Sequence, residues 1–183
     1  VQFVQDHGGR YMMIDILTTG WSSLQAMRDL DYNLLIHAHR AGHAAFTRSH
    51  KHGINMVVIA KVARLIGVDQ LHIGTAVGKM AETREEVLEN KKACTEPING
   101  IKPVLPIASC GLHTGMVPKL VEIFGKETVI QAGGGIHGHP EGTIIGARAM
   151  RQAVDAYMKG IKLKDYAKAH PELEKALEKW PVL

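Results

Sequence analysis

The sequence lacks any long hydrophobic run: none of its apolar stretches reaches the roughly 18 residues of a membrane-spanning helix. Its first residues, VQFVQDHGGRY, also lack the basic and then apolar layout of a signal peptide. Cysteine is scarce, and the two that are present, Cys94 and Cys110, have no paired spacing. This argues against a disulfide framework and against a cysteine zinc site. We therefore expect a cytoplasmic protein that does not enter the membrane.

Aromatic residues are also few, at 5% of the chain, and the basic residues are spread along it. Proteins that bind nucleic acid usually combine a concentrated basic stripe with stacking aromatic side chains, so no nucleic-acid partner is expected. The net charge of +4 favours a small anionic ligand instead. With 183 residues, the chain is long enough for one domain with a sizeable core. It lacks a starting methionine, and we expect it to be a piece of a longer protein.

Short apolar runs alternate with longer amphipathic stretches along the chain. Such alternation predicts right-handed crossovers and a parallel sheet. A complete TIM barrel needs eight strand–helix units in about 250 residues, so five units predict either a doubly wound open sheet or part of a barrel. The predicted strands are 11–17, 33–38, 70–73, 104–109 and 128–131, and the predicted helices are 21–29, 54–67, 82–94, 115–125, 140–159 and 163–179.

Polar or glycine-rich residues close every predicted strand. They are Asp15 after the first, His37 to Arg40 after the second, His72 after the third, Ser109 after the fourth, and Gln131 with the triplet 133–135 after the fifth. The carboxyl ends of parallel strands face one way, and ligand chemistry collects at that edge. The positions of these residues therefore predict a binding site.

Two of these groups suit anions. Bare backbone N–H groups at 133–135 and in SCG (109–111) allow a close approach of phosphate, although GGG alone also fits a tight turn. Arg40 offers a fixed fork of donors, and His72 adds another, unless His72 is simply bonded to a neighbouring backbone. We expect His37 to point away from His39 or deeper into the wall, with a structural role.

The segment IGTAVGKM (73–80) has the composition of a lid. Gly74 and Gly78 would let this loop open and close, carrying Lys79 over the site, where its charge could stabilise an anion that develops during the reaction. The alternative is a solvated lysine in a flexible loop. A zinc hydrolase is a further alternative, because HAH (37–39) is similar to the paired imidazoles of a metal site.

Four segments closely resemble one family. They are LLIHAHRAGHA, LHIGTAVGKM, LPIASCGLHTGMVPKLVEIFG and VIQAGGGIHGHPEGTIIGARAMRQAV, and they run in order through nearly the whole chain. They resemble the large-subunit barrel of ribulose-1,5-bisphosphate carboxylase/oxygenase (RuBisCO), most closely the archaeal form III type. The resemblance implies that residues 1–183 are the C-terminal portion of a TIM barrel, about strands 4 to 8. The N-terminal domain and the first barrel units would lie upstream.

The resemblance also implies a role for individual residues. His39 is similar to the catalytic histidine that handles protons of the sugar, and Lys79 to the lid lysine that positions CO2. Arg40 and His72 resemble the ligands of one phosphate, with His43 as a secondary histidine near Arg40. The remaining substrate-binding positions are Ser109 for the sugar backbone and Gly111, Gly133 and Gly134, with Gln131 beside them, for the other phosphate.

The implied reaction adds CO2, or O2 in a side reaction, to ribulose-1,5-bisphosphate, with Mg²⁺ as cofactor. The implied assembly is a homo-oligomer, either a dimer or an assembly of dimers. Form III likeness favours nucleotide salvage over a photosynthetic pathway. The magnesium ligands, including a carbamylated lysine, would lie upstream of residue 1, so we expect no metal ligand in this chain and no activity from it alone. A RuBisCO-like enolase of methionine salvage is the main alternative. Cys110 stands where many relatives have glycine, a departure that bears on the local backbone.

Overall fold

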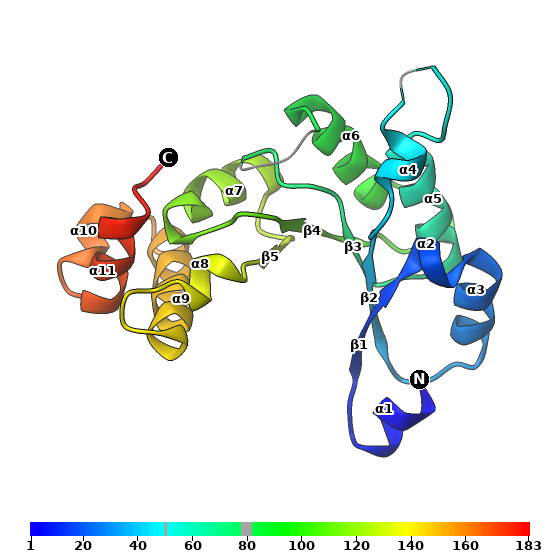
Figure 1. Ribbon diagram of the computed structural model, residues 1–183, viewed down its shortest axis with the longest axis horizontal. Coiled ribbons are helices and arrows are strands. Elements are labelled where there is room, and N and C mark those ends of the chain that lie inside the picture. The colour runs from blue at the N-terminus through cyan, green and yellow to red at the C-terminus, as the bar shows by residue number, and fades with distance from the viewer. Residues whose placement is uncertain (50, 78–81) are drawn as a thin grey trace. The chain divides into compact units, whose positions relative to one another are not determined.

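The computed structural model describes residues 1–49, 51–77 and 82–183, in which strands and helices alternate along the chain (Figure 1). The strands are β1 (Tyr11–Asp15), β2 (Leu35–His39), β3 (Gln70–His72), β4 (Leu105–Ser109) and β5 (Val129–Gln131). They form one sheet in the order β1-β2-β3-β4-β5, and the first three neighbouring pairs are parallel. This confirms the predicted α/β class, as part of a barrel.

The chain divides into two compact units. The first comprises residues 1–73 and 85–107, and the second comprises residues 74–84 and 108–183. The longer helices are α3 (Trp21–Asp29), α5 (Met56–Ile66), α6 (Arg84–Thr95), α7 (Val117–Phe124) and α9 (Thr143–Met158). Within the described ranges, no helix combines the length and the apolar character that crossing a membrane requires.

Helix α5 shows how the sequence sets the helix ends in the first unit. The Asn55 side chain accepts a hydrogen bond from the Val57 N–H at 2.8 Å and so caps the first turn. Gly67 ends the helix with φ of 99°, a left-handed conformation that glycine adopts without strain. Ile59 and Ala63 on one face are buried, so the helix packs through its apolar stripe.

Arg64, on the same helix, is a buried anchor for the turn between α6 and β4. Its guanidinium donates to four backbone carbonyls, those of Ala93 (3.2 Å), Glu96 (2.7 Å), Ile101 (3.3 Å) and Lys102 (2.9 Å). These bonds satisfy carbonyl groups that no sheet or helix uses. They fix the turn that delivers the chain into β4.

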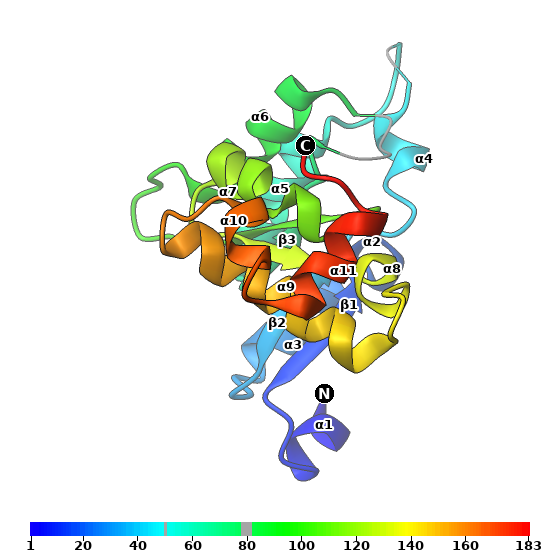
Figure 2. The same ribbon diagram turned by 90° about the vertical axis from the view of Figure 1, so that its left-hand side faces the viewer.

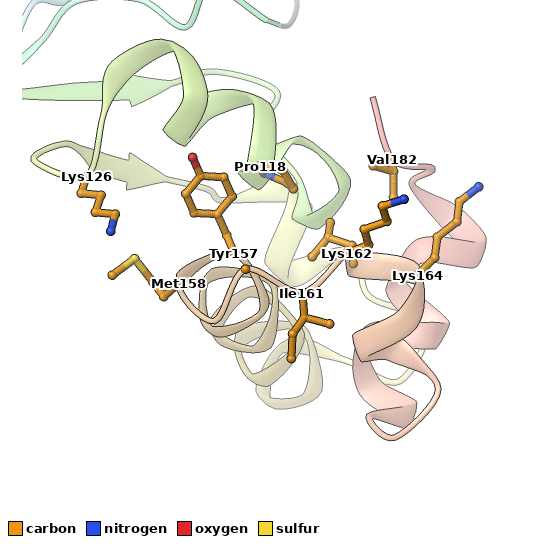
Figure 3. A pocket seen from close by; sticks show the side chains of 10 residues that line it. Pro118, Lys126, Tyr157, Met158, Ile161, Lys162, Lys164 and Val182 are labelled. Atoms are coloured by element: carbon orange, nitrogen blue, oxygen red, sulfur yellow. The ribbon is translucent and has the colours of Figure 1, made fainter.

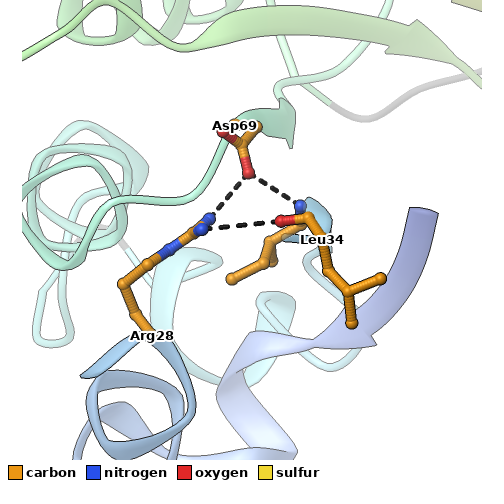
Figure 4. Close-up of polar contacts among 4 residues, drawn as sticks. Arg28, Leu34 and Asp69 are labelled. Carbon is orange, nitrogen blue, oxygen red and sulfur yellow. Dashed lines mark hydrogen bonds and ion pairs between the residues drawn. The ribbon is translucent and has the colours of Figure 1, made fainter. Parts of the chain in front are cut away.

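A second arginine connects helix α3 to the sheet (Figure 4). The Nη2 atom of Arg28 lies 2.6 Å from Oδ2 of Asp69, which also accepts the Ile36 N–H at 2.8 Å. Both charged side chains are partly exposed, so the ion pair contributes less than about 1 kcal/mol. Its main effect is to fix the start of β3 against β2.

The second unit packs α9 against α7, α10 (Leu163–Ala167) and α11 (Pro171–Lys179) (Figure 2). Its core includes Val117, Ala153, Leu163 and Leu173. The single helix predicted over 163–179 is wrong, because Pro171 has no backbone N–H and disfavours a helical conformation in the residue before it. Pro171 instead occupies the first turn of α11.

Single-turn helices were absent from the sequence-based prediction. They are α1 (Gln2–Asp6), α2 (Ile16–Thr19), α4 (Ala44–Thr47), η1 (Thr114–Met116) and α8 (Gly134–His137). The strand predicted over 11–17 ends at Asp15, because α2 begins at the next residue. The glycine triplet opens a helix, since α8 starts inside it. One turn is too short for apolar periodicity to appear in a sequence.

Candidate functional site

In the first unit, the carboxyl ends of β1 and β2 bring an aspartate and a histidine together. Asp15 and His39 are opposite each other in the parallel pair, and the Nδ1 atom of His39 lies 2.5 Å from Oδ1 of Asp15. The carboxylate accepts the Nδ1 proton and orients the ring, which leaves Nε2 able to take a proton from a substrate. Both side chains are partly exposed, so a ligand can reach them.

His72, at the end of β3, is buried beside two other imidazoles. Its side chain is 3% exposed, and the rings of His37 and His39 stand edge-on to it at centroid distances of 4.8 and 4.6 Å. Burial, followed by the charges of His37, His39 and Arg40, lowers the pKa of His72 to about 3. His72 is therefore neutral at pH 7 and can serve an anion only as a hydrogen-bond donor.

Arg40 follows β2 directly and supplies the positive charge of this group. It is 5% exposed, and it lies close enough to His72 for its charge to lower the pKa of that imidazole. His43 donates its backbone N–H to the Arg40 carbonyl at 3.0 Å, and its ring bonds the Thr47 hydroxyl at 3.0 Å. The structure thus brings Arg40 and His72 together, while the secondary role of His43 stays a prediction.

The expectation that His37 could point away from His39 is wrong. Residues two apart on a strand share a face, and both rings contact His72. His37 lies deeper, at 3% exposure, with its Nε2 atom 2.7 Å from Nε2 of His72. Sequence reasoning also missed its partners Tyr11 and Gln70. The sequence did contain a signal for Gln70: it lies two residues before His72 on β3, so both side chains are on the same face, as are those of His37 and His39 on β2.

In the second unit, the loops that follow β4 and β5 lie side by side. A Cβ atom at Gly135 would lie 2.0 Å from the carbonyl oxygen of Leu112, so only glycine permits this contact. Leu112 follows Gly111 in the chain, and α8 begins at Gly134 with Gly133 as its N-cap. The first amides of a helix have no acceptor within it, so these N–H groups suit an anion. Gly135 therefore lies against the loop after β4, while the phosphate role of Gly111, Gly133 and Gly134 stays a prediction.

The strand-end residues of this second group differ in exposure. Ser109, the last residue of β4, is half-buried, whereas Gln131, the last residue of β5, is exposed. Cys110 has φ of +85° and Gly111 has φ of +67°, so two consecutive residues are left-handed. Glycine fits this backbone and cysteine is strained in it. Cys110, which stands where many relatives have glycine, therefore occupies a position whose backbone favours glycine.

Replacing Cys110 with glycine is expected to stabilise the protein by about 1 kcal/mol, because the left-handed strain on the side chain disappears. Chemical unfolding of the complete subunit would measure the change. Cys110→Ala is the matched control: it removes the thiol but keeps Cβ, and so should bring no such gain. Equal stability of the glycine and alanine variants would contradict the argument from strain.

Two further predictions concern a lid and a metal. Lys79 lies outside the described residues, so its place over the site stays a prediction. Among residues 1–49, 51–77 and 82–183, no group of three histidine, cysteine, aspartate or glutamate side chains could hold a metal ion. The partners of His39 and His37 are Asp15 and His72 rather than ligands of a zinc cage. Nothing in the described part of the chain thus favours the zinc hydrolase.

A cavity of about 730 Å³ in the second unit contains none of the predicted site residues (Figure 3). Its lining is largely apolar, with Tyr157 and Leu163 on its wall. Lys126, Lys162 and Lys164 also line it. Its lining contains no histidine, aspartate or glutamate, so the Asp15–His39 chemistry described above belongs to the strand ends and not to this cavity.

Comparison with known proteins identifies relatives along the whole chain. The family described as "Ribulose bisphosphate carboxylase large chain, catalytic domain" matches residues 1–180. A ribulose bisphosphate carboxylase of Pyrococcus furiosus is 55% identical over 100% of this chain and 44% of its own length. The crystal structure of octameric RuBisCO from Pyrococcus horikoshii has a TM-score of 0.94 and 53% identity, covering 97% of this chain and 42% of that one.

A rubisco-like protein of Alicyclobacillus acidocaldarius shares the fold but is more distant. Its structure has a TM-score of 0.92 and 33% identity, covering 98% of this chain and 45% of its own. The higher identity to carboxylases therefore favours that branch over the RuBisCO-like one. In each comparison, this chain spans less than half the length of the relative.

Proposed function

The chain belongs to the ribulose bisphosphate carboxylase large-chain family, and from this premise we propose that the complete protein containing it is a ribulose-1,5-bisphosphate carboxylase. The observation that carries this proposal is the group at the ends of β1, β2 and β3: a buried arginine and a neutral histidine beside a histidine held by an aspartate. It offers an anion site next to a base, which enolisation of a sugar phosphate requires.

We assign one substrate phosphate to each group of residues. Arg40 and His72 bind one, with His43 supporting Arg40, while the amides of Gly111, Gly133 and Gly134, beside Gln131, bind the other. His39 moves protons of the sugar hydroxyls, Ser109 contacts the sugar backbone, and Lys79 stabilises the new carboxylate. Two anion sites fix the substrate, so that the enediolate meets CO2 in one orientation and the adduct is cleaved into two molecules of 3-phosphoglycerate.

The metal and the remaining barrel units would come from upstream. We assign the Mg²⁺ ligands, with a carbamylated lysine, to the segment that precedes residue 1, as the family resemblance implies. The exposure of Tyr11, Met13 and Leu105 supports the proposal that another segment of the complete protein covers this surface. These large side chains are 50%, 58% and 40% exposed, and Met13 is in register with His37 on the face that carries the histidines.

We base the proposed assembly and pathway on the same relatives. The Pyrococcus horikoshii enzyme is octameric, and we propose a homo-oligomer built from dimers for the complete protein. We also propose an oxygenase side reaction, a cytoplasmic location and a role in nucleotide salvage. The RuBisCO-like enolase remains the second candidate, because a rubisco-like protein has the same fold at 33% identity.

Radiolabelled bicarbonate tests the proposed function. The complete subunit, incubated with ribulose-1,5-bisphosphate, Mg²⁺ and labelled bicarbonate, should place the label in 3-phosphoglycerate. An enolase would incorporate no label and would instead convert the diketone phosphate of methionine salvage. Absence of the label from a folded, metal-loaded subunit would contradict the carboxylase.

Replacement of Arg40 by methionine should raise the KM for ribulose-1,5-bisphosphate about a hundredfold, with a smaller change in kcat. Charge-assisted hydrogen bonds contribute about 1.5–3 kcal/mol each, and two of them account for this factor. Steady-state kinetics of the complete enzyme would measure it. Arg48→Met, at an exposed arginine beyond α4, is the control that should leave KM unchanged. An unaltered KM in the Arg40 variant would refute the phosphate role.

A further inference from the structure

A chain of hydrogen bonds connects the half-exposed Tyr11 to the buried His72. The Tyr11 hydroxyl contacts Nδ1 of His37 and lies 2.8 Å from Oε1 of Gln70, so its single proton can go to either acceptor. Nδ1 of His37 lies 2.9 Å from the same Gln70 oxygen, and Nε2 of His37 lies 2.7 Å from Nε2 of His72. Gln70 and both histidines are buried, so water has little access to these bonds. All four residues belong to the first unit.

Only one proton can lie between the two facing Nε2 atoms, and with both imidazoles neutral this leaves two arrangements of the chain. In the outward arrangement, Tyr11 donates to Nδ1 of His37, Nε2–H of His37 donates to His72, and His72 carries its proton on Nδ1. In the inward arrangement, Nδ1–H of His37 donates to the Gln70 oxygen, Nε2–H of His72 donates to His37, and Nδ1 of His72 has a lone pair.

The two arrangements have opposite consequences for an anion. A neutral imidazole donates from one nitrogen only, and its lone pair repels a phosphate oxygen. Only the outward arrangement lets His72 donate through Nδ1. Conversion of the inward to the outward arrangement conserves protons. One proton enters at Nδ1 of His72, the proton on Nε2 of His72 moves to Nε2 of His37, and the proton on Nδ1 of His37 moves to the Tyr11 oxygen. That oxygen then loses one proton. The Tyr11 hydroxyl is the end of the chain at which that proton is given up.

We propose that Tyr11 is a positioning residue, whose hydroxyl holds the His37–His72 pair in the tautomer that donates to the substrate phosphate. The proposal rests on the assignment of His72 to a phosphate in the proposed function. Gln70 has the opposing effect, because its carbonyl oxygen is the acceptor that favours the inward arrangement. Tyr11 and Gln70 thus set whether this wall of the site donates to an anion or repels it.

Neutron crystallography and phosphate binding on the complete subunit test this assignment. With inorganic phosphate bound, deuterium should be found on Nδ1 of His72 and on Nε2 of His37. Tyr11→Phe should move deuterium to Nε2 of His72 and weaken phosphate binding about tenfold, the effect of losing one hydrogen bond to a charged ligand. Gln70→Met, which removes the competing acceptor, should bind phosphate as tightly as the parent or more tightly.

Tyr32→Phe is the matched control, because it removes a hydroxyl that bonds Gln2 at an exposed position. It should change neither the tautomers nor the affinity. Unchanged binding in Tyr11→Phe, weaker binding in Gln70→Met, or weaker binding of Tyr11→Phe with unchanged tautomers would each overturn the proposal. A parent that binds phosphate but does not carboxylate the bisphosphate would refute the proposed function and leave the tautomer assignment standing.

Discussion

The isolated 183-residue chain is expected to give no turnover with ribulose-1,5-bisphosphate, bicarbonate and Mg²⁺, whereas the complete subunit is expected to carboxylate the substrate. The proposed function assigns the Mg²⁺ ligands to the segment upstream of residue 1, so the isolated chain would have no cation to stabilise the enediolate. Tyr11 and Met13 leave apolar surface exposed on the face of the sheet that carries the histidines, and β1 pairs with a strand on one side only. An edge of that kind favours association rather than catalysis.

The labelled-bicarbonate assay, run in parallel on the isolated chain and the complete subunit at equal concentration, checks this prediction. Circular dichroism of the isolated chain shows whether it has folded. Coexpression with the missing upstream segment is the matching experiment, and it should restore turnover. Measurable carboxylation by the isolated chain would contradict the account, because all the required chemistry would then reside in these 183 residues.

Replacement of His39 by asparagine is expected to lower kcat by a factor of about 10²–10⁴, the usual contribution of a positioned general base. Asparagine keeps a polar group near Asp15 but cannot take up a proton at the position of Nε2. The KM should change little, because the phosphates bind to other residues. Steady-state kinetics of the complete enzyme would measure both constants.

His52→Asn is the control for the His39 substitution, since His52 is an exposed histidine in a loop of the same unit. Its kcat should equal that of the parent. If His39→Asn retained full kcat, the Asp15–His39 pair would be a structural contact and the base would have to be another residue. A rise in KM with constant kcat would likewise assign His39 to binding rather than to proton transfer.

The sequence predicted the strands well because strand length and polar endings are local signals. Asp15, His39 and His72 were all expected at carboxyl ends, and the structure has each of them there. The break at Pro171 was equally local, and was missed because the apolar pattern continues through it. Single-turn helices such as α8 carry too few residues to show a period.

The site was predictable in its composition but not in its contacts. Arg40 and His72 were paired from their positions on neighbouring strands, and the structure brings them together. The close approach of Gly135 to Leu112 joins residues that are distant in sequence. The sequence indicates it only through the glycine at position 135. The hydrogen bonds from Tyr11 depend on register between three strands, which no pattern within one strand contains.

We have proposed that Arg40 with His72 and Gly111 with Gly133–Gly134 bind opposite ends of one bisphosphate. A crystal structure of the complete protein with a carboxylated bisphosphate analogue tests it most directly. We expect one phosphate within hydrogen-bond distance of the Arg40 guanidinium and the His72 ring. The other phosphate should bind to the amides of Gly111, Gly133 and Gly134. Density placing both phosphates away from either group would contradict it.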